Sequence, residues 1–340
     1  MKTLERLILL AGVATILLLL WHFNPRQVWG MVSRVGIWGL LAILSFQICD
    51  HTLNALGWRM AFPREDARGV PLWLLIKGRL AGDGVNYLTP SGQIVGELVR
   101  PGMLGKTASE HAKNSSVVIA KLAQTMGQAL FILLGLLFVL QGKLDFLKGR
   151  ERDAALAVGL ALFCLVGAGL WCLACEKTPR WLARFRKLEG LRSQSRSYLR
   201  EHPGRYLASV LFFMAGYGWG GLETLLICHF MRVSVGVVTA FAMEILSNLV
   251  DAVMFMVPAK MGTQEAGKTA IFRGFGYPGS VGLAFGLIRH LREFAWASAG
   301  FSLYAANRRA GKDSSISSLL PQDDAALPQR LPDPGTEQAA

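Results

Sequence analysis

Charged residues are scarce in this chain. They make up only 17% of its 340 residues, against 52% hydrophobic residues, so the sequence cannot supply the polar exterior of an ordinary soluble domain. The composition therefore predicts an integral membrane protein. A net charge of +13 could suggest a nucleic-acid partner, but the basic residues lie in loops beside apolar runs, which suits anionic lipid headgroups better. We expect no nucleic-acid partner.

Cysteine is also scarce, and signs of metal or cofactor chemistry are weak. The five cysteines are too few and too dispersed for a disulfide framework. Cys172 and Cys175 form a C-x-x-C pair, but it ends an apolar run with no second pair or histidine nearby, which favours a lipid-facing position over metal or redox chemistry. No H-E-x-x-H metal motif occurs. We expect no cofactor, no metal and no enzyme activity.

Long apolar runs dominate what is present. A bilayer core of about 30 Å needs roughly 20 apolar residues per helix. Five runs meet that length, at about residues 6–23, 36–57, 115–140, 154–175 and 206–230. A sixth run, about residues 279–305, is long enough but carries charged side chains. We predict an all-α, polytopic membrane protein with about six full transmembrane helices.

The distribution of Lys and Arg predicts the topology, because short cytoplasmic loops collect basic residues. If the amino terminus is cytoplasmic, residues 177–205, with nine Lys or Arg against two Glu, also lie inside. Residues 141–153 hold four basic residues and would lie outside, against this rule. We expect a multi-pass protein with both termini cytoplasmic, and an uncleaved first span because no small-x-small cleavage site follows it.

We expect one transmembrane domain, residues 1–309, with halves of about 36–140 and 206–305 joined by the basic cytoplasmic segment 176–205. Apolar residues at helical spacing between Trp181 and Leu191 fit an amphipathic helix on the membrane surface, and a solvated basic loop explains them about as well. Residues 310–340 lack periodicity and are rich in small and polar residues, which predicts a disordered tail.

Two further apolar segments, about residues 72–104 and 237–274, are each interrupted by proline, glycine and charged residues. Each predicts a re-entrant hairpin or a discontinuous helix rather than a full span. The segments align at one constant offset, which pairs Asp83, Pro90 and Glu97 with Asp251, Pro258 and Glu265. Because three spans separate them, they would enter from opposite faces as an inverted repeat. Such paired breaks indicate a substrate site near mid-membrane.

Ionisable residues inside membrane segments are costly and usually face the protein interior or a water-filled cavity, so they are candidates for a substrate pocket. In the first segment, proline and glycine interrupt the helical hydrogen bonds and leave backbone amides and carbonyls unpaired. The ends of the two half-helices could point such amides at a lipid phosphate. The second segment offers a similar set, although an ordinary extracytoplasmic loop also explains it. The candidate headgroup pocket comprises Asp83, Asn86, Pro90, Gly92, Gly96, Glu97, Arg100, Lys121, Asp251, Pro258, Gly262, Glu265, Arg289 and Glu293.

Polar stripes on three of the spans bear on this site. Lys121 shares a helical face with two glutamines, and it either faces the interior or extends to the membrane surface. Arg289 and Glu293 share a face of the last span, which favours an internal ion-pair network or a substrate contact. Asp50 and His51 could relay protons, but hydrogen bonding between helices is the interpretation that we favour.

The amino-acid sequence of these segments resembles that of the membrane region of lysylphosphatidylglycerol synthases and flippases. The resemblance rests on the runs Asn86-Tyr-Leu-Thr-Pro-Ser-Gly-Gln-Ile-Val-Gly-Glu97, Pro258-x3-Gly262-x2-Glu265 and Gly286-Leu-Ile-Arg289-x3-Glu293. It covers roughly residues 5–305 and is strongest for stand-alone, HpnL-type proteins associated with hopanoid biosynthesis. It implies a protein that translocates or handles lipids in a bacterial cytoplasmic membrane.

We therefore predict a flippase-like transporter that moves a hopanoid or a phospholipid headgroup between leaflets or membranes, with membrane lipids as its partners. Two alternatives stay open: an intramembrane transferase that modifies a lipid, and a non-catalytic scaffold that binds lipid-synthesis proteins. A change in the mass of a candidate lipid would favour the transferase. Tolerance of substitutions at the motif carboxylates would favour the scaffold.

Overall fold

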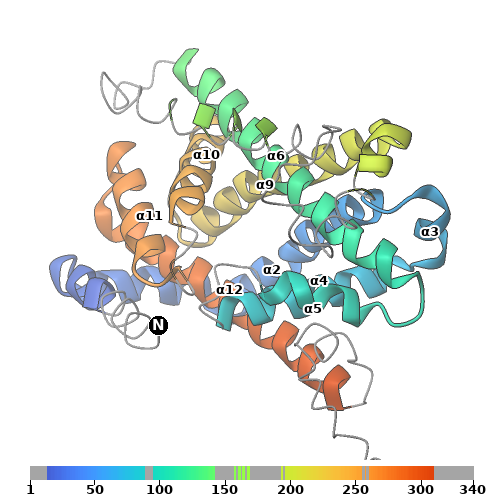
Figure 1. Cartoon of the computed structure of the whole chain (residues 1–340). Coiled ribbons are helices and arrows are strands. Elements are labelled where there is room, and N and C mark those ends of the chain that lie inside the picture. The colour runs from blue at the N-terminus through green and yellow to red at the C-terminus, as the bar shows by residue number, and fades with distance from the viewer. Residues whose placement is uncertain are drawn as a thin grey trace, which may run out of the picture.

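A computed structural model describes residues 14–88, 95–141, 196–254, 257 and 260–309, with a few single positions between 157 and 193. Within these residues the regular secondary structure is entirely helical, which confirms the predicted all-α fold. Residues 14–22 form a helix. The elements that follow are α2 (Pro25–Met60), α3 (Arg64–Gly69), α4 (Leu72–Leu88), α5 (Val95–Met103), α6 (Glu110–Gln141), α9 (Pro203–Phe230), α10 (Val237–Val253), α11 (Thr263–Gly274) and α12 (Gly279–Arg309) (Figure 1).

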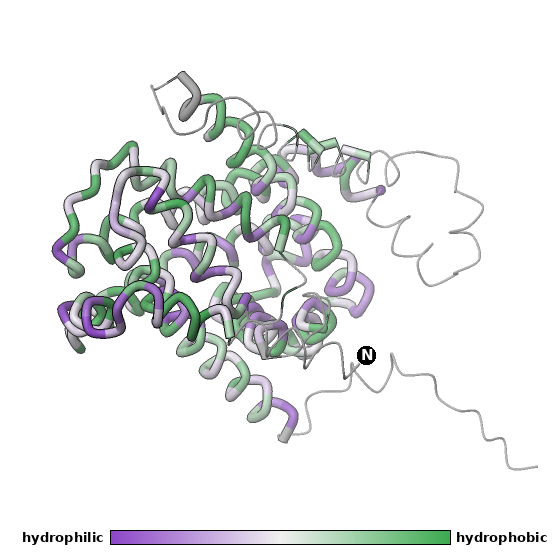
Figure 2. Tube along the Cα trace, turned by 90° about the vertical axis from the view of Figure 1, so that its left-hand side faces the viewer, coloured by the Kyte–Doolittle hydropathy of each residue, from purple (hydrophilic) through white to green (hydrophobic). Residues whose placement is uncertain are grey.

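Three of these helices, α2, α6 and α9, are long and apolar enough to cross a membrane, which confirms the prediction of transmembrane helices. Large apolar side chains such as Trp38 and Leu137 are exposed on them, as a hydrocarbon environment allows. Figure 2 shows hydrophilic positions interrupting the hydrophobic helices within the body of the protein as well as at its margins. Residues 1–13 and most of 154–175, which belong to two further predicted spans, lie outside the described residues.

Helix α2 begins at Pro25, ahead of the predicted start at residue 36. Asn24 caps it by accepting a hydrogen bond from the amide of Arg26 (3.1 Å), and proline in the first turn sacrifices no helical hydrogen bond. The predicted start is instead a kink, where Gly36 takes a φ of 59° that glycine adopts without strain. The apolar run therefore marks the portion of α2 that follows the kink.

The two broken segments are pairs of short helices in the structure. Helices α4 and α5 fill residues 72–103, and α10 and α11 fill residues 237–274 apart from the break between them. In each pair the two helices contact each other. A Cβ atom on Gly82 of α4 would lie 2.7 Å from the carbonyl oxygen of Gly96 on α5, so only glycine allows this approach. Residues 89–94 and four positions around the second break lie outside the described residues.

Helices α2 and α9 pack together through hydrogen bonds from α9 side chains to α2 carbonyl groups. The indole nitrogen of Trp219 donates to the carbonyl of Phe46 (3.0 Å). Arg205 donates to the carbonyl of Phe62, two residues after the end of α2 (2.9 Å), and to the carbonyl of Arg59 in its last turn (3.0 Å). A cation there satisfies carbonyls that the helix leaves unpaired and complements the negative end of its dipole.

Helices α4 and α12 approach each other at backbone distance. A Cβ atom on Gly84 would lie 2.5 Å from the carbonyl oxygen of Ala297, and one on Gly300 would overlap the carbonyl of Leu80. Small residues at helix contacts permit such approach in membrane proteins. The charged face of α12 is thereby brought beside α4, where both helices line the same cavity.

Candidate substrate site

A strongly polar cavity of about 250 Å³ lies among α2, α4, α6, α9, α10 and α12. Its charged lining consists of six acidic residues, four basic residues and His51; the acidic and basic residues are Asp50, Asp83, Glu223, Glu244, Asp251, Glu293, Arg79, Lys260, Arg289 and Arg292. A second cavity of about 290 Å³ shares part of this wall and adds Tyr87 and Trp296. Ionisable residues inside an apolar helical protein are candidates for function, so this cavity is the candidate substrate site.

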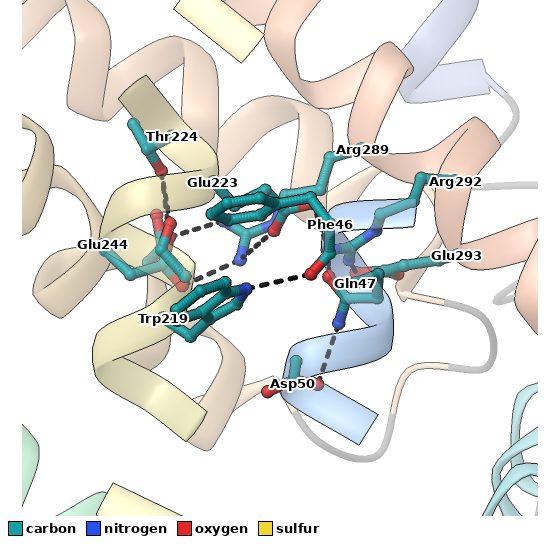
Figure 3. A network of polar contacts seen from close by, with 12 residues as sticks. Phe46, Gln47, Asp50, Trp219, Glu223, Thr224, Glu244, Arg289, Arg292 and Glu293 are labelled. Atoms are coloured by element: carbon teal, nitrogen blue, oxygen red, sulfur yellow. Dashed lines mark hydrogen bonds and ion pairs between the residues drawn. The ribbon is translucent and has the colours of Figure 1, made fainter. Parts of the chain in front are cut away.

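An ion-pair network joins three helices along the cavity wall (Figure 3). Arg289 on α12 donates to both carboxylate oxygens of Glu244 on α10, at 2.6 and 2.8 Å. Arg292, one turn further along α12, donates to Glu223 on α9 and to Gln47 on α2 (2.8 Å). The carboxylates are almost fully buried, so these pairs supply the hydrogen bonds that water cannot.

The second break carries its own ion pair. Lys260 Nζ lies 2.9 Å from Asp251 Oδ2, so the pair links the end of α10 to the residues that lead into α11. Glu293 of α12 also lines the cavity here, 3.1 Å from Arg292 and 3.4 Å from the Gln264 amide of α11. The contact with Gln264 places the first turn of α11 beside this carboxylate.

The first break has a matching arrangement. Arg100 of α5 is buried and bonds to Asp83 of α4 (2.7 Å) and to Glu97 of its own helix. Lys121 of α6 lies 3.1 Å from the other oxygen of Glu97. The ammonium group of Lys121 thus contacts an interior carboxylate, while its side chain, at 40% exposed, stays partly accessible. Of this cluster, only Asp83 lines the cavity itself.

Four other predicted site residues fix helices rather than line the cavity. The side-chain oxygen of Asn86 accepts a hydrogen bond from the amide of Gly96 (2.7 Å), which ties α4 to the start of α5. Glu265 accepts from the amide of Gly262 at the start of α11 (2.9 Å), where Gly262 has a positive φ of 77°. The other oxygen of Glu265 lies 2.8 Å from His290 Nδ1 of α12.

The structure therefore divides the predicted headgroup pocket into groups. Asp83, Asp251, Arg289 and Glu293 meet at the cavity. Glu97, Arg100 and Lys121 form the cluster beside it. Asn86, Gly96, Gly262 and Glu265 hold the short helices in place. Pro90, Gly92 and Pro258 lie outside the described residues.

Sequence reasoning missed three charged residues of the cavity, namely Arg79, Glu223 and Glu244. Each lies inside an apolar segment and is at most 5% exposed. The signal was available, because an ionisable residue in an apolar run is itself a pointer to the interior. Asp50 and His51 were noticed, and both line the two cavities.

Residues 262–269 read Gly-Thr-Gln-Glu-Ala-Gly-Lys-Thr, which matches the letters of a nucleotide-binding P-loop. A P-loop needs a strand, then a glycine-rich loop whose amides cradle phosphate, then a helix. Here Thr263 already begins α11, and the lysine at the motif position, Lys268, is 3% exposed. The match is therefore part of a packed helix, and the folded segment offers no phosphate cradle.

The fold and the cavity define an integral helical membrane protein with a charged interior. A sequence model of the lysylphosphatidylglycerol synthase TM region matches residues 7–299. The chain belongs to this family, which relates it to lipid handling. Comparison with curated proteins and with solved structures gives no match.

Proposed function

We propose that this protein is a flippase-like transporter that carries a lipid headgroup through the charged cavity while the lipid tails remain in the membrane. The cargo would be a hopanoid, to which the HpnL-type resemblance points, or a phospholipid. We place the protein in a bacterial cytoplasmic membrane with both termini inside. The observation that carries the proposal is the charged cavity, because a polar headgroup crosses hydrocarbon only if other polar groups replace its water.

Helix contacts support the inverted repeat that such a mechanism uses. If α2 is exchanged with α9, α4 with α10, α5 with α11 and α6 with α12, contacting pairs map onto contacting pairs. The α4–α12 contact becomes α10–α6, the α6–α9 contact becomes α12–α2, and the α2–α4 contact becomes α9–α10. The charged cavity then lies between the two halves, where repeat-built transporters bind their substrates.

The sequence offset agrees with this exchange of helices. An offset of 168 residues separates Asp83 from Asp251 and Glu97 from Glu265, and it also separates Lys121 from Arg289. In each half, the carboxylate of the second short helix contacts a basic group of the following long helix. In one half Glu97 contacts Lys121. In the other half Glu265 contacts His290, which is the residue next to Arg289. Rocking of one half against the other would open the cavity to each side of the membrane in turn.

Transport fits the geometry better than catalysis. The pair formed by Glu265 and His290 resembles an acid–base pair, but Glu265 is fully buried and belongs to neither cavity wall. Five of the six cavity carboxylates are engaged in ion pairs. These arrangements suit binding and release of a headgroup rather than proton transfer to one.

Reconstitution tests the proposal. Proteoliposomes carrying fluorescent phospholipid are treated with a membrane-impermeant quencher, and we expect label in the inner leaflet to be lost faster than in protein-free vesicles. Gln124→Trp fills the cavity from α6 and should reduce the rate to that of protein-free vesicles. Leu137→Trp, on the exposed face of the same helix, is the matched control and should transport normally. Equal rates for Gln124→Trp and the wild type would contradict the assignment.

A further inference from the structure

Two charged residues of the polar cavity form no ion pair with any other side chain in the described part of the chain. Among the described residues, the ion pairs that involve the other acidic and basic residues of the cavity are Asp83 with Arg100, Glu223 with Arg292 and Arg289, Glu293 with Arg292, Glu244 with Arg289, and Asp251 with Lys260. Arg79 and Asp50 also line the cavity and belong to none of these pairs. The cavity thus retains one unpaired cation and one unpaired carboxylate.

Arg79 is the unpaired cation. It lies on α4, is 5% exposed, and its Nε and Nη1 atoms are buried without a hydrogen-bond partner. The guanidinium carbon lies 5.3 Å from the ring centroid of Phe213, which contacts one face of the guanidinium group. The aromatic ring offers no lone-pair acceptor, so the Nε and Nη1 donors remain unsatisfied. A buried cation without partners is costly, and a ligand oxyanion would remove that cost.

Asp50 is the unpaired carboxylate. Its partners are the side-chain amides of Gln47 (2.8 Å) and Asn54 (2.9 Å), which are neutral. Gly216 of α9 faces it, and a Cβ atom there would lie 3.2 Å from Asp50 Oδ1. The glycine keeps the space beside this oxygen open to a ligand donor.

We propose that Arg79 binds the phosphate of the transported lipid and that Asp50 binds a hydroxyl or ammonium group of the same headgroup. The proposal rests on the proposed function and names its substrate class, a phospholipid whose head carries a hydrogen-bond donor. A neutral hopanoid head would satisfy Asp50 but leave Arg79 buried and unpaired. A phosphate oxygen pair matches the fork of a guanidinium group.

Binding to the purified, detergent-solubilised protein tests this recognition. The probes are dioctanoyl phosphatidylethanolamine, which carries phosphate and ammonium, dioctanoylglycerol, which lacks both, and free inorganic phosphate. Isothermal titration calorimetry should show that Arg79→Gln weakens binding of the phosphatidylethanolamine about tenfold or more, with little effect on dioctanoylglycerol. Asp50→Asn should weaken binding of the phosphatidylethanolamine as well. Arg68→Gln, at an exposed arginine of α3, is the matched control and should bind as the wild type does.

The outcomes separate the proposal from the transport function. Wild-type affinity in Arg79→Gln, or equal wild-type affinity for dioctanoylglycerol and phosphatidylethanolamine, would overturn the phosphate assignment even if lipid transport persists. Tighter binding of the phosphatidylethanolamine than of inorganic phosphate supports a lipid headgroup, whereas equal binding would identify free phosphate as the ligand and overturn the lipid source. If Arg79→Gln fails to fold, Arg79→Lys keeps the charge without the fork and should show intermediate affinity.

Discussion

Neutralising Glu244 is expected to destabilise the protein, because this carboxylate is the acceptor at the centre of the ion-pair network. It accepts two hydrogen bonds from Arg289 at 2.6 and 2.8 Å, and further bonds from Thr224 (3.2 Å) and Asn248 (3.0 Å). Its side chain is only 3% exposed, so water cannot replace it. Glu244→Gln keeps the shape but leaves the guanidinium of Arg289 without its principal counter-charge.

The magnitude follows from the burial of the pair. Removing one partner of a buried ion pair costs about 3–5 kcal/mol. Glu223 lies 3.6 Å from Arg289 and would still offset part of its positive charge. We therefore expect Glu244→Gln to lower the free energy of unfolding by the lower end of this range, about 3 kcal/mol. Removing both charges, with Glu244→Gln and Arg289→Met, should cost less than the sum of the two single substitutions, because no charge is left unpaired.

Unfolding in mixed micelles with increasing SDS measures these differences. The matched control is Glu110→Gln, because Glu110 pairs with Lys113 at 2.6 Å but its own side chain is 69% exposed. Lys113 is buried, and in this variant it keeps its 2.6 Å hydrogen bond to the carbonyl of Gly105. That substitution should change the free energy of unfolding by less than about 1 kcal/mol. A Glu244→Gln variant as stable as Glu110→Gln, or additive effects in the double variant, would refute the reasoning.

Three further substitutions probe other parts of the structure. Glu97→Gln should abolish lipid transport in proteoliposomes while leaving membrane insertion intact, because Arg100 keeps its bond to Asp83; normal transport would remove Glu97 from the site. Gly300→Leu should destabilise the α4–α12 contact and lower the thermal unfolding temperature in detergent, whereas Gly30→Leu, with open space around it, should not. Gly262→Ala should cost about 1–2 kcal/mol in the same SDS unfolding measurement, because its φ of 77° strains any residue with a side chain; an unchanged stability would show that the start of α11 tolerates another conformation.

The fold class and the helix positions were readable from the sequence because they depend on local patterns. Apolar runs predicted α2, α6 and α9, and the bounds of the two broken segments match the outer ends of α4, α5, α10 and α11 closely. The kink at Gly36 was not predicted, because one glycine inside an apolar run carries no sign of its φ. The P-loop letters at residues 262–269 carry no sign of their conformation either.

The cavity was only partly readable, because its partners come from distant parts of the chain. The sequence predicted that Arg289 and Glu293 share an interior face of the last span. It did not predict the carboxylates beside that face, Glu244 and Glu223, which lie on other helices. No periodicity within α12 can specify which carboxylates face it. Arg79 was not predicted because it precedes the proline and glycine break on which the candidate site was based. Helix packing through small residues, which brings α4 against α12, is what unites these groups.

Accessibility of the cavity from the two sides of the membrane tests the central claim most directly. A single cysteine at Gln124, which lines the cavity, would be introduced into a variant whose native cysteines are replaced by serine. The label is a membrane-impermeant thiol reagent, applied to right-side-out and to inside-out vesicles. Alternating access predicts labelling from both sides, with binding of a transported lipid slowing both reactions. Labelling from one side only, or no labelling from either side, would contradict transport through this cavity.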